Sequence, residues 1–346
     1  MTTAVRVTAR EEPQVALAPP LAGEGAPLRV ALAGCGTVGG ALLGLLQGHR
    51  EGVRRRLGRG VEVVSVLVRD AARERPHAPH RERVTTDPAA FLAAGADVVV
   101  EAIGGIDPAG EIVRDALARG AHVVTANKAL LAAHGPSLLR LATQRGARLE
   151  FEASVGGAVP VVRTLRDQLA GHGVQCIRGV INGTTNFILD RLAEGSAWEA
   201  AVAEAQRLGF AEADPSRDLD GRDAEDKLRV LAWLGFHADP RTVPVRREGI
   251  SPALAPLARD AAAGGRTVRL VAELRLEGRR LSGTIAPRVL DANDPLAAAR
   301  GEENAFEIHS ESAGVIRLSG KGAGGSATAS AVLADLLRAG SQVPER

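Results

Sequence analysis

The stretch Val30-Ala-Leu-Ala-Gly34-Cys-Gly36-Thr-Val-Gly39 decides the fold class of this chain. An apolar, strand-like run leads into the spacing G-x-G-x-x-G, and apolar residues at helical spacing follow it. In this context Gly34 permits a tight turn, Gly36 lets the backbone approach a pyrophosphate and Gly39 lets the helix pack closely. The stretch therefore predicts a nucleotide-binding loop, which also contains Cys35, Thr37 and Val38. The alternative is a glycine turn in an α/β domain that binds no nucleotide.

Short apolar runs continue this pattern and alternate with amphipathic stretches. Strand alternating with helix predicts a Rossmann-type, doubly wound parallel sheet. The predicted strands are 28–33, 61–68, 97–102, 121–125 and 148–152. After about residue 152 the pattern changes to helices near 158–170, 184–193, 197–208 and 222–235, followed by strands at 267–275, 281–286 and 306–309. This second pattern predicts an α+β domain.

These patterns divide the chain into four segments. Residues 1–27 contain four prolines and no periodic apolar pattern, which predicts a disordered tail. We expect a dinucleotide-binding domain over 28–150, a substrate-binding and catalytic domain over 151–320, and a C-terminal helix within 321–341.

The composition excludes several classes of function. The chain has 346 residues, and its 43 Lys and Arg against 41 Asp and Glu leave a net charge of +2, which gives no argument for a nucleic-acid partner. No apolar stretch is long enough for a membrane span, and two cysteines are too few for a disulfide scaffold, so we expect a cytoplasmic protein. Tyrosine is absent. Any mechanism that uses a phenol as general acid is therefore excluded.

The second predicted strand ends at Arg69, where an NAD-binding enzyme usually carries an acid for the ribose 2′-hydroxyl. A guanidinium suits a 2′-phosphate, which favours NADP with NAD tolerated. A solvated arginine at a strand end is an equally open interpretation.

Two segments place lysines and carboxylates between apolar elements. Lys128 follows the strand at 121–125, at the edge of a parallel sheet where ligands bind. Segment 209–227 concentrates acids before an amphipathic helix, and in that helix Asp223 and Lys227 are four residues apart and share one face. An ordinary cap and surface salt bridge would also explain this pair. Because tyrosine is absent, a buried lysine becomes the candidate proton donor for a reductase.

Taken together, the motifs resemble homoserine dehydrogenase over about residues 28–337. They are GCGTVGG (34–40), VEAIGG (100–105), TANKALL (125–131), FEASVGGAVP (151–160), NGTTNFIL (182–189), LGFAEADPSRDLDGRDAEDK (208–227) and GKGAGGSATA (320–329). The resemblance implies a reversible, NAD(P)-linked reduction of L-aspartate β-semialdehyde to L-homoserine, a step toward threonine and methionine.

The resemblance also assigns roles to residues. It implies that Lys227 is the catalytic proton donor and acceptor, with Lys128 close to nicotinamide and substrate. Glu212 and Asp223 match the acids that hold the substrate's amino group, and Asp218 lies in the same substrate-binding cluster. Besides the nucleotide loop, Arg69 and Lys128, the expected cofactor contacts are Ile103, Gly104 and Gly324, the last on a segment that returns to the first domain. A monovalent cation, usually sodium, would bind at Glu152, Val155, Gly157 and Val159, although a glycine-rich hinge explains the same residues. The resemblance further implies a homodimer formed through the second domain.

The chain ends a few residues after its last predicted helix, whereas many bacterial relatives continue into a regulatory domain. We therefore expect a short form without that domain. Two alternatives stay open: a dehydrogenase that acts on another semialdehyde, and a cofactor-binding sensor or scaffold without turnover.

Overall fold

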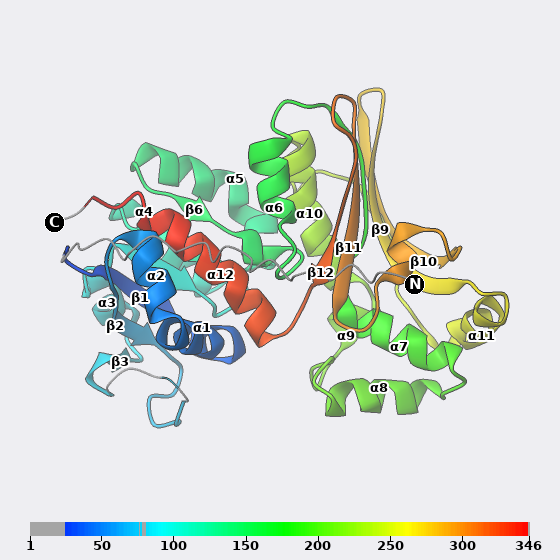
Figure 1. Ribbon diagram of the computed structural model, residues 1–346, viewed down its shortest axis with the longest axis horizontal. Helices are drawn as coiled ribbons and strands as arrows, with labels where there is room; N and C mark the ends of the chain where they lie inside the picture. The colour runs from blue at the N-terminus through cyan, green and yellow to red at the C-terminus, as the bar shows by residue number, and fades with distance from the viewer. Residues whose placement is uncertain (1–24, 76, 78–80, 345–346) are drawn as a thin grey trace, which may run out of the picture.

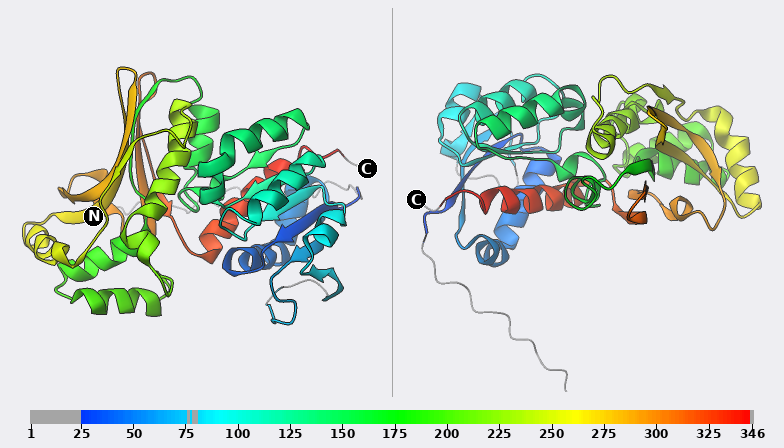
Figure 2. Two further views of the ribbon diagram at one scale, coloured as in Figure 1. Left: turned by 180° about the vertical axis from the view of Figure 1, so that it is seen from behind. Right: turned by 90° about the horizontal axis from the view of Figure 1, so that it is seen from above.

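The computed structural model describes residues 25–75, 77 and 81–344, and within them the chain forms two six-stranded sheets, each with its own helices (Figure 1). Seen from above, the two units lie side by side (Figure 2). The predicted tail at 1–27 lies outside the described residues except for 25–27.

The first sheet is parallel, with the order β3-β2-β1-β4-β5-β6. Its strands are β1 (Leu28–Ala33), β2 (Val61–Leu67), β3 (Val84–Thr85), β4 (Val98–Glu101), β5 (His122–Thr125) and β6 (Leu149–Glu150). Its helices are α1 (Thr37–Gly48), α2 (Arg50–Leu57), α3 (Pro88–Ala93), α4 (Ala109–Ala118), α5 (Lys128–Gln144) and α12 (Gly325–Gly340), with a 3-10 turn, η1 (Arg81–Arg83). This strand order is that of dinucleotide-binding sheets. The predicted Rossmann-type class is confirmed.

Both faces of this sheet are buried because helices cover each of them. Along β1, Val30 and Leu32 pack toward α1 and α12, whereas Ala31 and Ala33 belong to the apolar cluster that includes α4 and α5. A strand buried on both faces carries apolar residues at nearly every position, as β1 does. Helix α12 comes from the far end of the chain and packs against α1, through residues such as Val332 (Figure 1).

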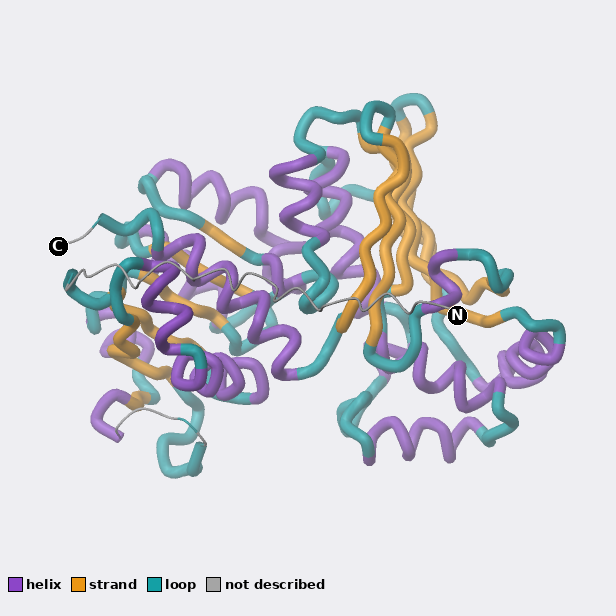
Figure 3. Tube along the Cα trace, viewed as in Figure 1, coloured by secondary structure: helices purple, strands orange, loops and turns teal. Residues whose placement is uncertain are grey.

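The second sheet has the order β12-β11-β7-β9-β10-β8, and only the β10–β8 pair is parallel among its pairings in the described residues. Its strands are β7 (Val174–Val180), β8 (Val245–Arg247), β9 (Thr267–Glu277), β10 (Arg280–Leu290), β11 (Glu303–Ser310) and β12 (Gly314–Lys321). Around them lie η2 (Glu152–Ser154), α6 (Val161–Arg163), the π turn η3 (Thr164–Gln168), α7 (Gly183–Ala193), α8 (Trp198–Arg207), α9 (Ser216–Leu219), α10 (Arg222–Phe236), η4 (Pro252–Leu254), α11 (Ala255–Ala263) and η5 (Pro295–Ala298). The hairpins β9–β10 and β11–β12 form the long strands of this unit (Figure 3).

One face of the second sheet holds the apolar core of its unit. Ile177, Leu274 and Ile308 are buried there, in the same cluster as Leu228 and Leu231 of α10. Helices α7 and α11 also pack against this sheet through β9. The core therefore supports α7 and α10, and the first turns of α10 carry Asp223 and Lys227.

The two connections between the units lie against each other. The backbone N–H of Ala158 donates to the Lys321 carbonyl at 3.0 Å. Gly157 has φ +58°, and a Cβ at this position would lie 2.6 Å from the Gly322 carbonyl oxygen. Glycine is required at 157 for both reasons. Among residues 25–75, 77 and 81–344, no helix combines the length and apolar character needed to cross a bilayer.

Candidate active site

The nucleotide loop has the backbone geometry that its sequence predicts. Gly34 has φ +96°, and a Cβ there would lie 2.6 Å from the Ala102 carbonyl oxygen. A Cβ at Gly39 would lie only 2.1 Å from the Gly34 carbonyl oxygen, so the first turn of α1 can pack on the loop only if residue 39 is glycine. A Cβ at Gly36 would meet no atom within 4 Å. The backbone at Gly36 is thus open on the side where a ligand would approach.

Two helix N-termini meet beside this loop. Helix α1 begins at Thr37 and α12 begins at Gly325, and neither has a side-chain cap hydrogen bond. A Cβ at Gly325 would lie 2.9 Å from the Thr37 side chain, which shows how closely the two helix starts approach. Uncapped N-termini present free N–H groups and the positive ends of two helix dipoles, an arrangement that favours an anion.

A cavity of about 660 Å³ opens at this edge of the first sheet. Six of the predicted cofactor residues line it: Gly34, Cys35, Gly36, Arg69, Ile103 and Gly104. Arg73, Arg75 and the acid Asp70 line it as well. Burial raises the pKa of the Cys35 thiol, although Arg75 acts in the opposite direction. The thiol is therefore protonated near neutral pH, as expected of a small filler residue.

A buried acid shapes the loop after β4. Glu101 is fully buried; one of its carboxylate oxygens accepts the backbone N–H groups of Ile103 (2.8 Å) and Gly104 (2.9 Å), and the other accepts the Thr125 hydroxyl (2.5 Å). Three donors compensate for the cost of burying the carboxylate. Glu101 therefore couples the end of β4 to the end of β5, a role that was not predicted.

The position of Lys128 follows from the same network. Asn127 caps α5 by accepting the Leu130 N–H at 3.1 Å, and its amide nitrogen donates to the Gly105 carbonyl at 2.6 Å. These two bonds fix the first turn of α5 against the loop after β4. Lys128 is thereby held at the carboxyl edge of the sheet, facing the second unit.

The central feature of the site is one carboxylate between two lysines. The Lys128 ammonium lies 2.9 Å from Asp223 Oδ1, and the Lys227 ammonium lies 2.8 Å from Asp223 Oδ2. Lys227 also donates to the Ile181 carbonyl at 2.7 Å. The side chains of Lys227 and Asp223 are only 13% and 12% exposed, so this is not the exposed salt bridge of the simpler interpretation.

The pKa directions follow from this arrangement. Burial alone would raise the pKa of Asp223, but Lys227 and Lys128 outweigh it and hold that pKa far below its usual range. The charge of Asp223 raises the pKa of Lys128 despite burial of the ammonium group. Asp218 differs, because burial and the nearby Asp223 charge raise the pKa of its carboxyl. The cluster thus combines an acid that stays ionised with a neighbour that is easier to protonate.

The comparisons with known proteins agree with this geometry. Residues 34–152 match the family model described as homoserine dehydrogenase, NAD binding domain, and residues 160–337 match the model described as homoserine dehydrogenase. The chain is 41% identical over 325 residues to a homoserine dehydrogenase of Corynebacterium glutamicum, covering 92% of this chain and 73% of that protein. The chain belongs to the homoserine dehydrogenase family.

Two solved homoserine dehydrogenases extend the comparison. The crystal structure of the protein from Thiobacillus denitrificans has a TM-score of 0.82 at 35% identity, covering 93% of this chain and 77% of that one. A hyperthermophilic archaeal homoserine dehydrogenase in complex with NADPH has a TM-score of 0.77 at 28% identity, covering 92% of this chain and 99% of that one. The match to the NAD-binding model, with the NADPH complex of this relative, supports a nicotinamide cofactor for the first unit.

Within this homoserine dehydrogenase fold, the other predicted substrate residues differ in their surroundings. Asp218 is hydrogen-bonded to Asn182 (2.7 Å), which also donates to Asp223 (3.0 Å). Glu212 is exposed in the loop after α8, and among the described residues no hydrogen bond or ion pair joins its side chain to the cluster. Its role in substrate binding stays a prediction.

The predicted cation site contains a buried acid that already has partners. Glu152 is 4% exposed, and its two carboxylate oxygens accept the backbone N–H groups of Val162 (2.9 Å) and Arg163 (2.8 Å). The carboxylate therefore caps α6. A cation here would be held mainly by carbonyl oxygens, such as those of Val155, Gly157 and Val159, which are suitable ligands for a hard ion. In the described parts of the chain, no group of three or more His, Cys, Asp or Glu side chains is arranged for a metal.

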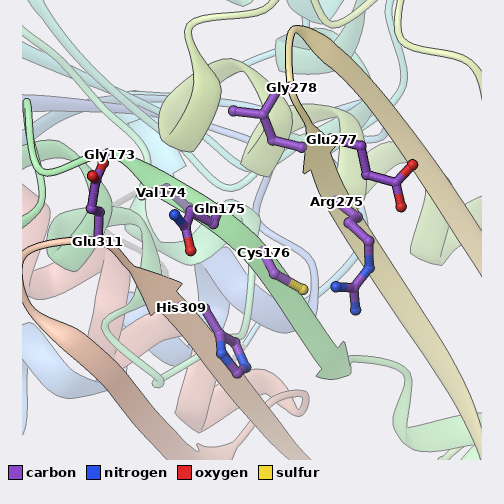
Figure 4. A pocket seen from close by; sticks show the side chains of 10 residues that line it. Gly173, Val174, Gln175, Cys176, Arg275, Glu277, Gly278, His309 and Glu311 are labelled. Atoms are coloured by element: carbon purple, nitrogen blue, oxygen red, sulfur yellow. The ribbon is translucent and has the colours of Figure 1, made fainter.

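Two further cavities differ in their relation to this site. One of about 750 Å³ shares Gly104 with the nucleotide cavity and is lined by Lys128 together with Arg217 and Asp226 from α9 and α10. The other, of about 620 Å³, lies on the second sheet and contains none of the predicted site residues (Figure 4). It is lined by Cys176, Arg275 and His309 among others. Of the predicted site residues, only Gly104 and Lys128 line the cavity of about 750 Å³, whereas Lys227 and the three predicted substrate acids do not.

Proposed function

We propose that this chain catalyses the reversible, NAD(P)-linked reduction of L-aspartate β-semialdehyde to L-homoserine, in threonine and methionine biosynthesis. The observation that carries the proposal is the Lys128–Asp223–Lys227 cluster beside a nucleotide cavity. An aldehyde reduction needs a hydride, a proton and a means to hold the substrate. The family shown by the comparisons favours this reaction over reduction of another semialdehyde.

Lys227 is the proposed proton donor in the reductive direction. When bound, the nicotinamide cofactor supplies the hydride. An ammonium group has three hydrogens; Lys227 directs two of them at Asp223 and Ile181, and one is left for a substrate oxygen. A positioned proton donor contributes about 10²- to 10⁴-fold to the rate. The Lys128 ammonium lies beside the same carboxylate. Its positive charge would stabilise the negative charge that develops on the substrate oxygen during hydride transfer.

The acids of the cluster are the proposed partners of the substrate's ammonium group. Asp223 forms ion pairs with two lysines, and their positive charges offset its attraction for the substrate's ammonium group. The charge of Asp218 is not matched by a lysine in this way, and Glu212 lies on a neighbouring exposed loop. We therefore assign the ammonium group mainly to Asp218 and Glu212, with Asp223 adjoining them.

NADP is the proposed cofactor, and NAD is tolerated. Arg69 stands at the end of β2, and Arg73 and Arg75 line the same cavity. Guanidinium groups recognise phosphate well, so these arginines favour a 2′-phosphate, whereas Asp70 in the same cavity suits a ribose 2′-hydroxyl and allows NAD. Gly324 contributes through the N-terminus of α12, whereas Thr37, Val38 and Gly39 contribute through the first turn of α1.

Three further expectations belong to this proposal. A monovalent cation, sodium by chemistry, would bind the carbonyl oxygens near Glu152, Val155, Gly157 and Val159. The second unit would pair with a second copy of the chain as a homodimer, while residues 28–150 act as the cofactor unit and 151–320 as the substrate unit. We expect the enzyme to act in the cytoplasm, where both free cysteines would stay reduced.

One assay tests the proposed reaction. The purified chain is incubated with L-homoserine and either NADP or NAD, and reduced cofactor is followed by absorbance. We expect turnover with both cofactors and a higher kcat/KM with NADP. Absence of turnover in both directions, with saturating cofactor and aspartate semialdehyde in the reverse assay, would contradict the proposal.

A further inference from the structure

The turn that joins β7 to α7 holds a buried amide between two acids of the site. Asn182 is 5% exposed. Its amide nitrogen lies 2.7 Å from Asp218 Oδ1 and 3.0 Å from Asp223 Oδ2. One uncharged group therefore contacts two carboxylates that come from different elements, α9 and α10.

The orientation of this amide is fixed by the helix that follows. Asn182 Oδ1 accepts the backbone N–H of Thr185 at 2.9 Å and caps α7. Because a backbone N–H can only donate, the amide oxygen must face Thr185, and the NH₂ group must face the acids. The cap thus determines which atoms the acids meet.

The neighbouring hydroxyl cannot replace this donor. Thr184 Oγ1 lies 2.5 Å from the Phe210 carbonyl and 3.2 Å from Asp218 Oδ2. A hydroxyl has a single hydrogen, and the shorter contact to Phe210 takes it. Asn182 is then the donor on which an ionised Asp218 depends.

We propose that Asn182 is a positioning residue that keeps Asp218 and Asp223 ionised side by side, and so keeps the Lys128–Asp223–Lys227 cluster in its working charge state. The two carboxylates repel each other, and Asp223 is the one that forms ion pairs with Lys128 from α5 and Lys227 from α10. A neutral donor to both acids reduces the repulsion without adding a charge that would compete for the substrate's ammonium group. This inference rests on the proposed function for its kinetic consequences, but not for its electrostatic ones.

Two substitutions separate this role from helix capping. Asn182→Asp keeps a cap residue of equal quality and nearly equal shape, but replaces the two donors with a third carboxylate. Asn182→Ser keeps a capping oxygen and replaces the two N–H donors with a single O–H on a shorter side chain, without adding charge. We expect Asn182→Ser to keep a melting temperature near that of the unsubstituted chain, whereas Asn182→Ala, which loses the cap, melts lower. Asn182→Asp keeps the cap, but its added buried charge lowers the melting temperature as pH rises above the pKa of the acids, so its stability is compared with the others at acidic pH.

Kinetics give the first readout. We expect kcat/KM for homoserine to fall roughly 10- to 100-fold in Asn182→Asp and less in Asn182→Ser, since hydrogen bonds to charged groups are lost. The acidic limb of the kcat/KM profile should move to higher pH in Asn182→Asp, because three adjacent carboxylates hold a proton more tightly. Unchanged rates and an unchanged acidic limb in Asn182→Asp would overturn the inference, and so would a loss of activity that follows the melting temperature across all three variants.

A second readout does not need turnover, so failure of the proposed function is distinguishable from failure of this inference. The chain contains three lysines, Lys128, Lys227 and Lys321, and ¹³Cε labelling of lysine gives one NMR signal from each. In Asn182→Asp the signals of Lys128 and Lys227 should shift, and that of the exposed Lys321, which pairs with Glu302, should not. If the first two signals keep their positions, Asn182 does not set the charge state of the cluster.

Discussion

The nucleotide region and the lysine and carboxylate cluster are built from different parts of the polypeptide. The nucleotide region depends on backbone geometry: Gly34 and Gly39, where a Cβ would clash with a carbonyl oxygen, and two helix N-termini without side-chain caps. The cluster depends on charged side chains that are buried and paired, such as Asp223 and Lys227. A backbone site is sensitive to shape, whereas a side-chain site is sensitive to charge and to proton exchange. Substitutions that change only one of these properties should therefore affect only one region.

The largest effect is expected from Lys227→Arg. This change keeps a positive charge beside Asp223, but a guanidinium does not release a proton at accessible pH. We expect turnover to fall by about 10²- to 10⁴-fold, the range for loss of a placed proton donor. Binding of NADPH, measured by its fluorescence, should be unchanged because the nucleotide region is untouched.

Lys321→Arg is the matched control for this substitution. Lys321 is 70% exposed and pairs with Glu302, and an arginine can keep that ion pair. Its turnover should equal that of the unsubstituted chain. If Lys227→Arg also retained full turnover, positive charge alone would explain the role of residue 227, and proton donation would be assigned elsewhere.

The second-largest effect is expected from Gly39→Ala, which changes the nucleotide region. The new Cβ would lie 2.1 Å from the Gly34 carbonyl oxygen, so either α1 or the loop must move. We expect the affinity for NADPH to fall at least about tenfold, which corresponds to 1.4 kcal/mol, with kcat at saturating cofactor less affected. Fluorescence titration with NADPH measures the change.

Gly40→Ala is the control on the neighbouring residue of the same helix. A Cβ at Gly40 would meet no atom within 4 Å, and alanine is favoured over glycine in a helix by about 0.5–1 kcal/mol. This variant should bind NADPH normally and melt slightly higher. Equal NADPH affinity in both variants would show that close packing of α1 on the loop is not needed for the cofactor.

The same contrast explains how much the sequence predicts. The nucleotide loop and β1 are predicted to the residue, because turn and strand requirements act on adjacent positions. The pairing of Asp223 with Lys227 is also predictable, since both lie on one helix face. By contrast, the apolar pattern alone did not indicate β7 or β12, although β7 is central in its sheet. Their glycines and charged residues interrupt the apolar alternation, and only pairing with β9 and β11 makes them strands.

Contacts between distant segments could not be predicted. The helix expected at 158–170 is only the three residues of α6 followed by a π turn. Arg59 is 4% exposed and donates to the carbonyls of Gly340, the last residue of α12, and of Val343 beyond it. Nothing near Arg59 in sequence indicates an acceptor 281 residues away. The bond from Thr125 to Glu101 and the bonds from Asn182 to Asp218 and Asp223 depend on the tertiary fold in the same way.

The smallest predicted effect concerns the contact between α12 of the first unit and the segment around Glu152 that leads into the second unit. Asp335 of α12 is 1% exposed; it accepts the Glu152 N–H at 2.6 Å and pairs with Arg163 at 2.9 Å. Burial, assisted by the charges of Glu150 and Glu152, raises the pKa of Asp335 to about 7. Between about pH 4, where an unfolded aspartate titrates, and pH 7, the folded chain therefore binds one more proton here than the unfolded chain. The contribution of Asp335 to stability must fall as pH rises through this window and become constant above it.

Asp335→Asn removes the titration but keeps an oxygen that can accept the Glu152 N–H. We expect the melting temperature of the unsubstituted chain to fall between pH 5 and pH 8 by more than that of Asp335→Asn, with a difference of about 2–4 °C for each kcal/mol of stability. The exposed Asp115 of α4, changed to Asn, is the control for loss of one negative charge. Parallel melting curves for Asp335→Asn and the unsubstituted chain would mean that Asp335 is ionised throughout, held by Arg163. The contact between Asp335 and Arg163 would then be an ion pair at every pH tested, and not one that depends on the protonation of Asp335.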